Sequence, residues 1–223
     1  MTGIVQVFLA ALGVSYVLTP VVKRLAFRLG ALDTPVARSV HTSPTPYLGG
    51  VAMYAAFSGA VLLFLRPRDP AVDTILWCAG LAVALGFVDV RRRLSPVVFL
   101  GGQVAVALAL ALAGVRVLWV TNPFGGMFYL GAWGVPVTVL WVVAVMNVVN
   151  LSDGLDGLAA GISSIAALTL LFGAVQQEQA RAAVLAAALA GATLGFLPYN
   201  FTPAKIFMGD GGSMLLGFVL AAV

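Results

Sequence analysis

The sequence predicts an all-α fold, a polytopic membrane helical bundle with seven full transmembrane helices and a truncated eighth. The first observation is composition. Of 223 residues, 61% are hydrophobic and 9% are charged, whereas soluble globular proteins contain roughly 45–50% and about 25%. The second is the mean hydropathy of +1.06. The third is the pattern, because the apolar residues gather into stretches near the roughly 20 residues that one helical span requires. We therefore expect residues 1–223 to form a single transmembrane domain.

The expected spans follow one another with short polar connections. They cover residues 3–22, 47–65, 74–88, 96–114, 133–149, 157–175 and 181–198, with an eighth beginning near Gly212.

The two ends of this series differ in kind. The first stretch has Lys23 and Arg24 directly after it and lacks a small-residue cleavage site, so we expect a permanent span. The last runs from Gly212 to Val223 and covers roughly 18 Å of a hydrocarbon core about 30 Å thick. We therefore expect the domain to be incomplete at its C-terminus.

The charged residues indicate orientation. With the N-terminus outside, two thirds of the basic residues fall on the cytoplasmic side, in agreement with the positive-inside rule. They are Lys23, Arg24, Arg28, Arg38, Arg91, Arg92, Arg93 and Lys205. The basic residues form no stripe, which argues against nucleic acid as a partner. Cys78 is the single cysteine, so the chain has no disulfide framework.

The segment Asn-Val-Val-Asn-Leu-Ser-Asp-Gly-Leu-Asp-Gly after the fifth span carries two amides and two carboxylates. Desolvating such groups is costly unless they are paired or used. If the helix continues, Asn147, Asn150 and Asp153 share a face, with Asp156 one turn further. Oxygens that converge in this way suit a hard cation or a polar ligand. The alternative is that Ser152 or Asp153 caps the next helix within a solvated loop.

A second cluster runs from Tyr199 to Ser213 and combines an amide, a base, an aromatic ring and an acid. Glycines on both sides of Asp210 can expose backbone N–H groups at the start of the next helix, where a phosphate is favoured. The alternative is an ordinary helix N-terminus capped by Asp210 or Ser213.

Two further loops belong to the same predicted membrane face. In the proline-rich loop of residues 33–50, Arg38 and His41 are able to hold an anion, although a lone loop histidine is more often only solvated. In the other loop Asp89 precedes three arginines, which more often mark topology or contact anionic headgroups. Asp89 can also simply pair with one of these arginines.

Taken together, the four loops bring carboxylates, cations, amides, an aromatic ring and glycine turns to one face. This set suits a Mg²⁺-bound nucleoside diphosphate at a membrane surface, and it predicts phosphoryl transfer. A transporter is less favoured, because its ionisable residues would lie near the bilayer midplane.

The same residues resemble glycosyltransferase family 4, the polyprenyl-phosphate N-acetylhexosamine-1-phosphate transferases of bacterial envelope synthesis. Residues 33–50 resemble its D-x-P-x-x-R-x-x-H-x-x-P-x-P-x-x-G-G loop, and residues 87–103 its Asp-Asp loop, Leu-Ser-Pro and downstream Gln. Residues 147–161 are similar to N-x-x-N-L-x-D-G-L-D-G-L-A-x-G, and residues 200–217 to N-x-x-P-A-K-I-F-M-G-D-x-G-S-x-x-x-G.

The resemblance implies that a polyprenyl phosphate attacks the β-phosphorus of a UDP-N-acetyl sugar and releases UMP. It implies Mg²⁺ as cofactor, with Mn²⁺ as the alternative ion, and Asp210 as its ligand. It implies catalytic roles for Asp89, Asp153 and Asp156. The substrate-binding residues it implies are Asn150, Asn200, Phe207, Arg38, His41 and Lys205, with Phe207 placed to stack on uracil.

The resemblance also implies partners and a location. The partners are the polyprenyl phosphate, the UDP-sugar and the lipid bilayer, and a homodimer is left open. The location is the bacterial cytoplasmic (inner) membrane, with a multi-pass chain and the active site on the cytoplasmic face.

Finer features of the motifs bear on the substrate. The Pro-Thr-Pro-Tyr-Leu-Gly-Gly form with His41 is more similar to the branch that uses UDP-N-acetylglucosamine. The alternative is the peptidoglycan branch, which uses UDP-MurNAc-pentapeptide.

The chain also departs from the family pattern. Val90 stands where the family has a second Asp, and Phe99 where a basic residue is usual. The family also continues with further spans and a His-containing loop. These departures keep open a catalytically impaired relative or fragment that binds lipid phosphate or UDP-sugar.

Overall fold

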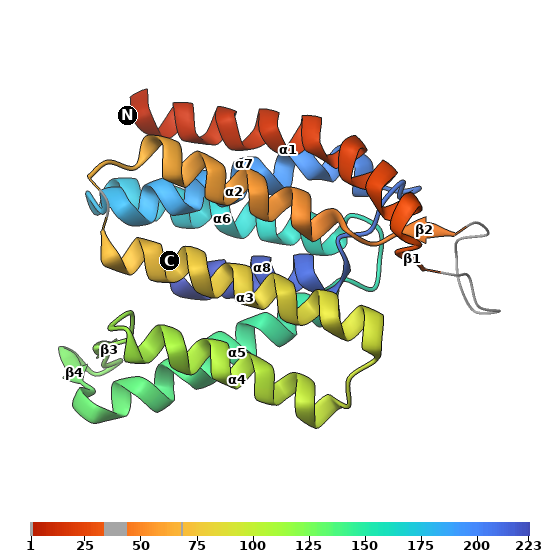
Figure 1. Cartoon of the computed structure of the whole chain (residues 1–223). Coiled ribbons are helices and arrows are strands. Elements are labelled where there is room, and N and C mark those ends of the chain that lie inside the picture. The colour runs from red at the N-terminus through yellow and green to blue at the C-terminus, as the bar shows by residue number, and fades with distance from the viewer. Residues whose placement is uncertain (1, 34–43, 68) are drawn as a thin grey trace.

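The computed structural model describes residues 2–33, 44–67 and 69–223. Within these ranges it contains eight α-helices, which confirms the all-α class, and the helices lie side by side along one bundle axis (Figure 1). Their bounds are α1 (Thr2–Leu29), α2 (Gly49–Phe64), α3 (Pro70–Arg92), α4 (Pro96–Leu112), α5 (Gly134–Ser152), α6 (Leu158–Gln176), α7 (Ala180–Asn200) and α8 (Gly209–Ala222).

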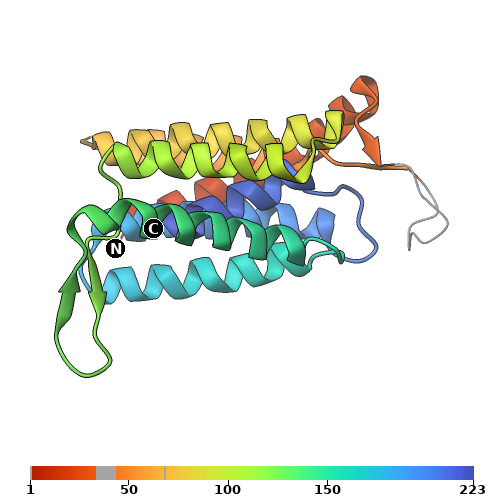
Figure 2. The same cartoon turned by 90° about the horizontal axis from the view of Figure 1, so that it is seen from below.

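The described residues also form two small antiparallel strand pairs that the sequence did not predict. Strand β1 (Leu32–Asp33) pairs with β2 (Thr45–Pro46), and β3 (Trp119–Thr121) pairs with β4 (Met127–Tyr129), followed by a 3₁₀ turn, η1 (Gly131–Trp133). The β3–β4 hairpin extends away from one end of the bundle, across the direction of the helices (Figure 2). All six of its strand residues are exposed.

Helix length supports five of the seven predicted full spans. Five helical segments are long and apolar enough to cross a bilayer: residues 3–29, 70–92, 131–152, 158–176 and 180–200. The helices α2, α4 and α8 have 16, 17 and 14 residues. At about 1.5 Å per residue, α2 and α4 fall short of a core about 30 Å thick. Five of the predicted spans therefore contain helices of full spanning length, whereas α2 and α4 are shorter than a full span.

Local capping explains where two helices begin. The Asp69 side chain accepts a hydrogen bond from the backbone N–H of Ala71 at 2.9 Å, with Pro70 at the first helical position. This cap lets α3 start four residues before the predicted apolar stretch at 74–88. The hydroxyl of Ser95, followed by Pro96, accepts in the same way from Val98 N–H and starts α4 as predicted.

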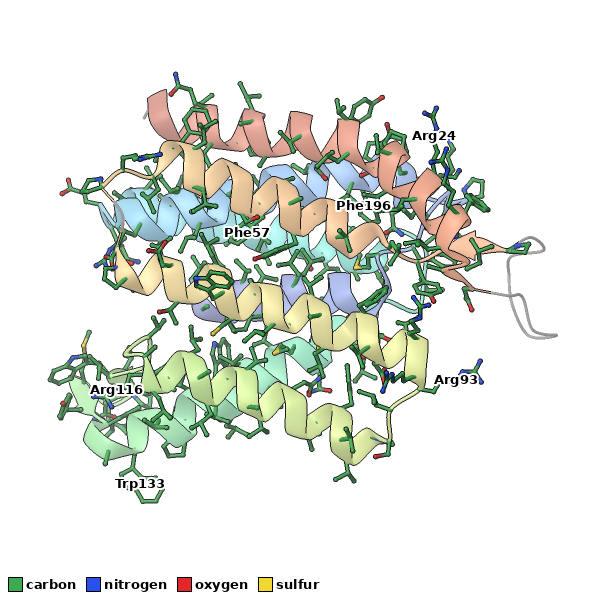
Figure 3. The ribbon with its side chains drawn as sticks, viewed as in Figure 1. Arg24, Phe57, Arg93, Arg116, Trp133 and Phe196 are labelled. Atoms are coloured by element: carbon green, nitrogen blue, oxygen red, sulfur yellow. The ribbon has the colours of Figure 1, made fainter. Side chains whose placement is uncertain are left out.

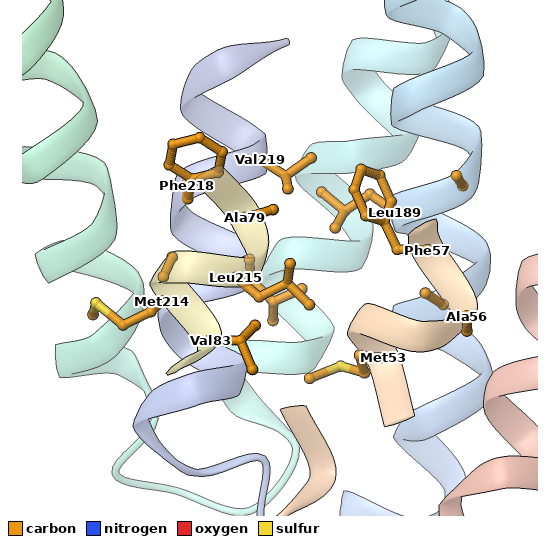
Figure 4. Packing of buried hydrophobic residues seen from close by; sticks show 14 of the residues in the cluster. Met53, Ala56, Phe57, Ala79, Val83, Leu189, Met214, Leu215, Phe218 and Val219 are labelled. Carbon is orange, nitrogen blue, oxygen red and sulfur yellow. The ribbon is translucent and has the colours of Figure 1, made fainter. Parts of the chain in front are cut away.

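The short helix α8 occupies the middle of the bundle. Its Met214, Leu215, Leu216 and Phe218 have no solvent exposure. Their side chains pack between α3, α5 and α2 (Figure 4). The middle of α8 is therefore enclosed by neighbouring helices.

The long helices α1 and α7 pack against each other at backbone distance. A Cβ atom at Gly191 or Gly195 of α7 would lie 2.3 Å from a backbone oxygen of α1. Small residues four apart permit such close approach in membrane bundles.

The two ends of the bundle differ in the residues they carry. Arg24 and Arg93 lie at one end, whereas Arg116 and Trp133 lie at the opposite end (Figure 3). The connections α3–α4, α5–α6 and α7–α8 share the end with Arg93 (Figure 1). The polar loops therefore meet at one end, as the sequence predicted.

Candidate functional site

Asp210, in the first turn of α8, lies at the centre of this polar end. The side-chain amide of Asn150, in the last turn of α5, donates to Asp210 Oδ1 at 2.8 Å and to Ser213 Oγ at 2.9 Å. Met208 occupies the N-cap position of α8, and its side chain makes no cap bond. The alternative in which Asp210 or Ser213 caps this helix is therefore wrong. Asn150 instead holds the Asp210 carboxylate in place.

Asp89 reaches the same place from the last turn of α3. Its Oδ1 accepts a hydrogen bond from the backbone N–H of Leu94 at 2.9 Å, across the left-handed residue Arg93 at φ 49°. The Asp89 carboxyl also interacts electrostatically with the Asp210 carboxyl. Two acidic side chains from different helices therefore lie near each other, as the sequence predicted.

The α5–α6 connection contributes two more carboxylates. Helix α5 ends at Ser152, so Asp153 is its C-cap residue and Asp156 lies in the following turn. The continuous-helix interpretation is wrong, and so is the cap alternative, because Gly157 precedes α6 and no side chain caps it. Asp156 Oδ2 accepts from the backbone N–H of Ala204 at 2.9 Å. This bond ties the α5–α6 turn to the α7–α8 connection.

The four carboxylates form one electrostatic cluster. The pKa of Asp153 is raised to about 7, first by burial and then by the negative charges of Asp210 and Asp156. Asp89 adjoins the cluster through Asp210. Like charges in a poorly solvated site raise one another's pKa unless a cation is present. The cluster is therefore suited to a cation or to shared protons.

The raised pKa of Asp153 predicts how stability depends on pH. Between about pH 4 and about pH 7 the folded chain holds a proton at Asp153 that the unfolded chain has lost. The stabilising contribution is therefore complete below about pH 4 and lost as the pH rises through about 7. Each pKa unit of difference is worth about 1.4 kcal/mol. Thermal unfolding in detergent without divalent cations should show this decline, and Asp153→Asn should flatten it. An unchanged slope in the variant would contradict the assignment.

Asn200, which the resemblance implied as a substrate-binding residue, has a buried side chain. It is 2% exposed, and its side-chain amide donates to the backbone oxygen of Ile206 at 3.2 Å. Its Oδ1 is buried without a hydrogen-bond partner among the described residues. The Asn200 side chain thus links the end of α7 to the α7–α8 connection.

Phe207 and Lys205 occupy the remainder of that connection. The Phe207 backbone N–H donates to Pro46 O at 2.8 Å, and its carbonyl accepts from Gly49 N–H at 3.0 Å. These bonds hold the half-buried Phe207 against the start of α2. Lys205 is exposed, and its backbone N–H donates to Tyr199 O at 2.8 Å. Arg38 and His41 lie outside the described residues.

Gly86 and Gly50 bring two helices against the start of α8. A Cβ atom at Gly86 would lie 2.3 Å from the carbonyl carbon of Asp210, and one at Gly50 would lie 2.3 Å from the backbone nitrogen of Gly212. Gly211 and Gly212 are themselves buried. These glycines serve close backbone packing. The sequence did not predict this role of Gly86, because the close approach of α3 to α8 arises only when the helices pack.

The donor set fits a magnesium ion. In the parts of the chain that the structure describes, no three acidic, histidine or cysteine side chains are grouped as a metal site. Mg²⁺ does not need such a group, because proteins often bind it through one or two carboxylates together with substrate phosphates and water. Asp89 and Asp210 provide such a pair of carboxylates.

Comparison with known proteins identifies relatives of this chain. Residues 73–223 match the family described as Glycosyl transferase family 4. A Bacillus subtilis (strain 168) protein, named as a probable undecaprenyl-phosphate N-acetylglucosaminyl 1-phosphate transferase, is 38% identical over 99% of this chain and 62% of its own length. A decaprenyl-phosphate N-acetylglucosaminephosphotransferase of Mycobacterium tuberculosis (strain ATCC 25618 / H37Rv) is 38% identical over 96% of this chain and 58% of its own length.

A third relative carries a different name. The phospho-N-acetylmuramoyl-pentapeptide-transferase of Desulforudis audaxviator (strain MP104C) is 36% identical over 96% of this chain and 72% of its own length. The chain spans about 60% of the length of the first two relatives.

Proposed function

The chain belongs to glycosyl transferase family 4, and from this premise we propose that it transfers N-acetylglucosamine 1-phosphate from UDP-N-acetylglucosamine to a polyprenyl phosphate in the bacterial cytoplasmic membrane, releasing UMP. The observation that carries the proposal is the meeting of Asp89 and Asp210 within a cluster of four carboxylates at one end of an apolar bundle. A water-soluble sugar nucleotide and a membrane-bound isoprenoid can both reach such a place.

The proposal includes an arrangement in the membrane. Helices α1 to α7 each cross the bilayer, with α2 and α4 completed by flanking residues, and α8 enters it from the polar end. The N-terminus lies outside, and the carboxylate cluster lies on the cytoplasmic face. The support is the charge pattern, because two thirds of the basic residues fall on that side. Residues 1–223 then act as one transmembrane unit of the transferase.

The proposed reaction exchanges one phosphoanhydride linkage for another. An oxygen of the polyprenyl phosphate forms a bond to the β-phosphorus of the UDP-sugar. The bond from that phosphorus to the bridging oxygen breaks, and UMP leaves with the electron pair. Holding both reactants in line removes much of the entropic barrier.

Each residue of the cluster has a proposed task. Asp210, held by Asn150, and Asp89 carry the negative charge that binds Mg²⁺, while Asp89 also orients the lipid phosphate. Mg²⁺, or Mn²⁺ in its place, neutralises charge on the leaving phosphate when it is bound. Asp153 and Asp156 complete the nucleotide-sugar site.

The surrounding loops complete the proposed substrate contacts. Asn200 shapes this site, Phe207 offers its ring to uracil, and Lys205 offers its charge to phosphate. Arg38 and His41 are proposed to hold phosphate from the preceding loop.

The decisive test measures exchange of labelled UMP. Membranes that contain the full-length protein, Mg²⁺, polyprenyl phosphate and unlabelled UDP-N-acetylglucosamine should exchange labelled UMP into the UDP-N-acetylglucosamine. UDP-MurNAc-pentapeptide in its place tests the peptidoglycan alternative. Exchange with only that donor would change the substrate, and no exchange with either donor from a folded protein would reject the function.

Val90 favours a second candidate, an impaired relative that binds UDP-sugar or lipid phosphate without transfer. The structure argues against this reading, because Val90 lines a narrow apolar crevice with Tyr47, Leu48, Phe87 and Met208. We expect Val90→Asp to give no gain in exchange and a lower melting temperature, since a carboxylate there loses solvation without a partner. A large gain in exchange would instead support the impaired relative.

A further inference from the structure

Gln103 of α4 is fully buried where α4, α5 and α8 meet. Its Oε1 accepts a hydrogen bond from Asn147 Nδ2 at 2.8 Å, and its Nε2 lies 3.5 Å from Asn147 Oδ1. The same Nε2 donates to the sulfur of Met214 on α8 at 3.3 Å. One glutamine side chain therefore contacts both helices that carry the centre of the candidate site.

Each of these contacts lies next to the bonds around Asp210. Asn147 precedes Asn150 by three residues, so their side chains emerge on the same side of α5. Met214 follows Ser213, which accepts the second hydrogen bond of Asn150. Figure 4 shows the Met214 side chain turned toward α5. Gln103 is thus placed to define how α5 and α8 are rotated relative to each other.

The hydrogen bonds between Gln103 and Asn147 matter because a buried amide without a partner is costly. An amide group without a hydrogen-bond partner is expensive in an apolar interior. Asn147 also donates to Val143 O of its own helix at 2.7 Å, and Gln103 supplies its partner on another helix. Rotation of α5 would separate the two amides, so their pairing selects one rotation.

We propose that Gln103 is a positioning residue for the transfer reaction. Through Asn147 it fixes the rotation of α5 at which Asn150 meets Asp210. Gln103 acts only through its neighbours and does not touch substrate. The proposal rests on the proposed function, and it adds a residue from α4 to a site built by α3, α5 and α8.

The test compares single variants, the double variant and an exchanged pair, in which the two amide residues are swapped between positions 103 and 147. All are made in the full-length protein. Gln103→Leu and Asn147→Leu should each lower kcat for UMP exchange about 10- to 100-fold, as loss of an outer-shell partner does. The KM for polyprenyl phosphate should stay the same. The double variant should be no worse than the poorer single one, because the two residues act as a pair. Gln103→Asn combined with Asn147→Gln keeps one long and one short amide and should restore most activity.

Mn²⁺ binding to the purified protein, followed by electron paramagnetic resonance, gives a readout besides activity. Both single variants should bind Mn²⁺ more weakly, and the exchanged pair should recover. Thr193→Val is the matched control, because this buried hydroxyl of α7 donates to Leu189 O of its own helix at 2.7 Å. It should change neither kcat nor Mn²⁺ affinity.

Several results would overturn the positioning role. They are additive losses in the double variant, no recovery in the exchanged pair, and unaltered kcat and Mn²⁺ affinity in Gln103→Leu. If Gln103→Leu fails to fold, the exchanged pair decides the question. If the unaltered protein binds Mn²⁺ but exchanges no UMP, the proposed function fails, while the metal affinities still report on Gln103.

Discussion

Replacing Asp210 by Asn is expected to abolish UMP exchange, with a loss of about a thousandfold, since a metal ion contributes several kcal/mol and each 1.4 kcal/mol is tenfold in rate. The fold should survive, because an Asn at this position still offers an oxygen to the Asn150 amide, which now donates to Asp210 Oδ1 at 2.8 Å. What disappears is one negative charge beside Asp89. The initial exchange rate per amount of folded protein, at saturating Mg²⁺, measures the effect.

Asp69→Asn is the matched control for this substitution. Asp69 forms an ion pair with Arg181 at the start of α3, on the opposite end of that helix from Asp89. An exposed pair of this kind adds little stability, so the control should keep its exchange rate. If Asp210→Asn retained more than about a tenth of the activity, the electrostatic role of this carboxylate would be refuted.

Much of the fold was predictable because its determinants are local. Apolar stretches predicted the positions of all eight helices, and the pairs Asp69–Pro70 and Ser95–Pro96 mark helix starts by recognisable capping chemistry. The β3–β4 hairpin was missed because each strand has only three residues. A segment of three residues is too short to show the periodicity that distinguishes a strand from a loop.

The convergence of the four carboxylates Asp89, Asp153, Asp156 and Asp210 was predictable from the sequence, whereas the local backbone geometry around them was less so. Asn147 and Asn150 stay on one helix, so their common face followed from spacing alone. The end of α5 at Ser152 did not, because Ser, Asp and Gly fit both a helix end and a loop. The role of Gln103 depends on Asn147 and Met214, which approach it only after three helices have packed.

The role of Gly86 is the clearest case of a determinant that only packing reveals, and it carries the second large prediction. We expect Gly86→Ala to lower UMP exchange about a hundredfold, since a misplacement of 1 Å at a reacting site can cost that much. The added Cβ would lie 2.3 Å from the carbonyl carbon of Asp210 and 2.3 Å from the nitrogen of Gly211. Helix α3 must move away from α8, and Asp89, one turn further along α3, moves with it.

Two variants separate this displacement from a general loss of stability. Gly101→Ala is the same substitution in α4, at a glycine with no atom within 4 Å of the added Cβ, so it should keep activity. Its melting temperature should stay the same or rise, because Ala favours a helix over Gly. Gly86→Ala combined with Asp89→Glu lengthens the acidic side chain and should recover part of the exchange if distance to Asp210 is the cause. Full activity in Gly86→Ala, or no recovery in the combined variant despite normal folding, would show that α3 does not need this close approach to α8. The carboxylate pair would then depend on something other than the absence of a side chain at residue 86.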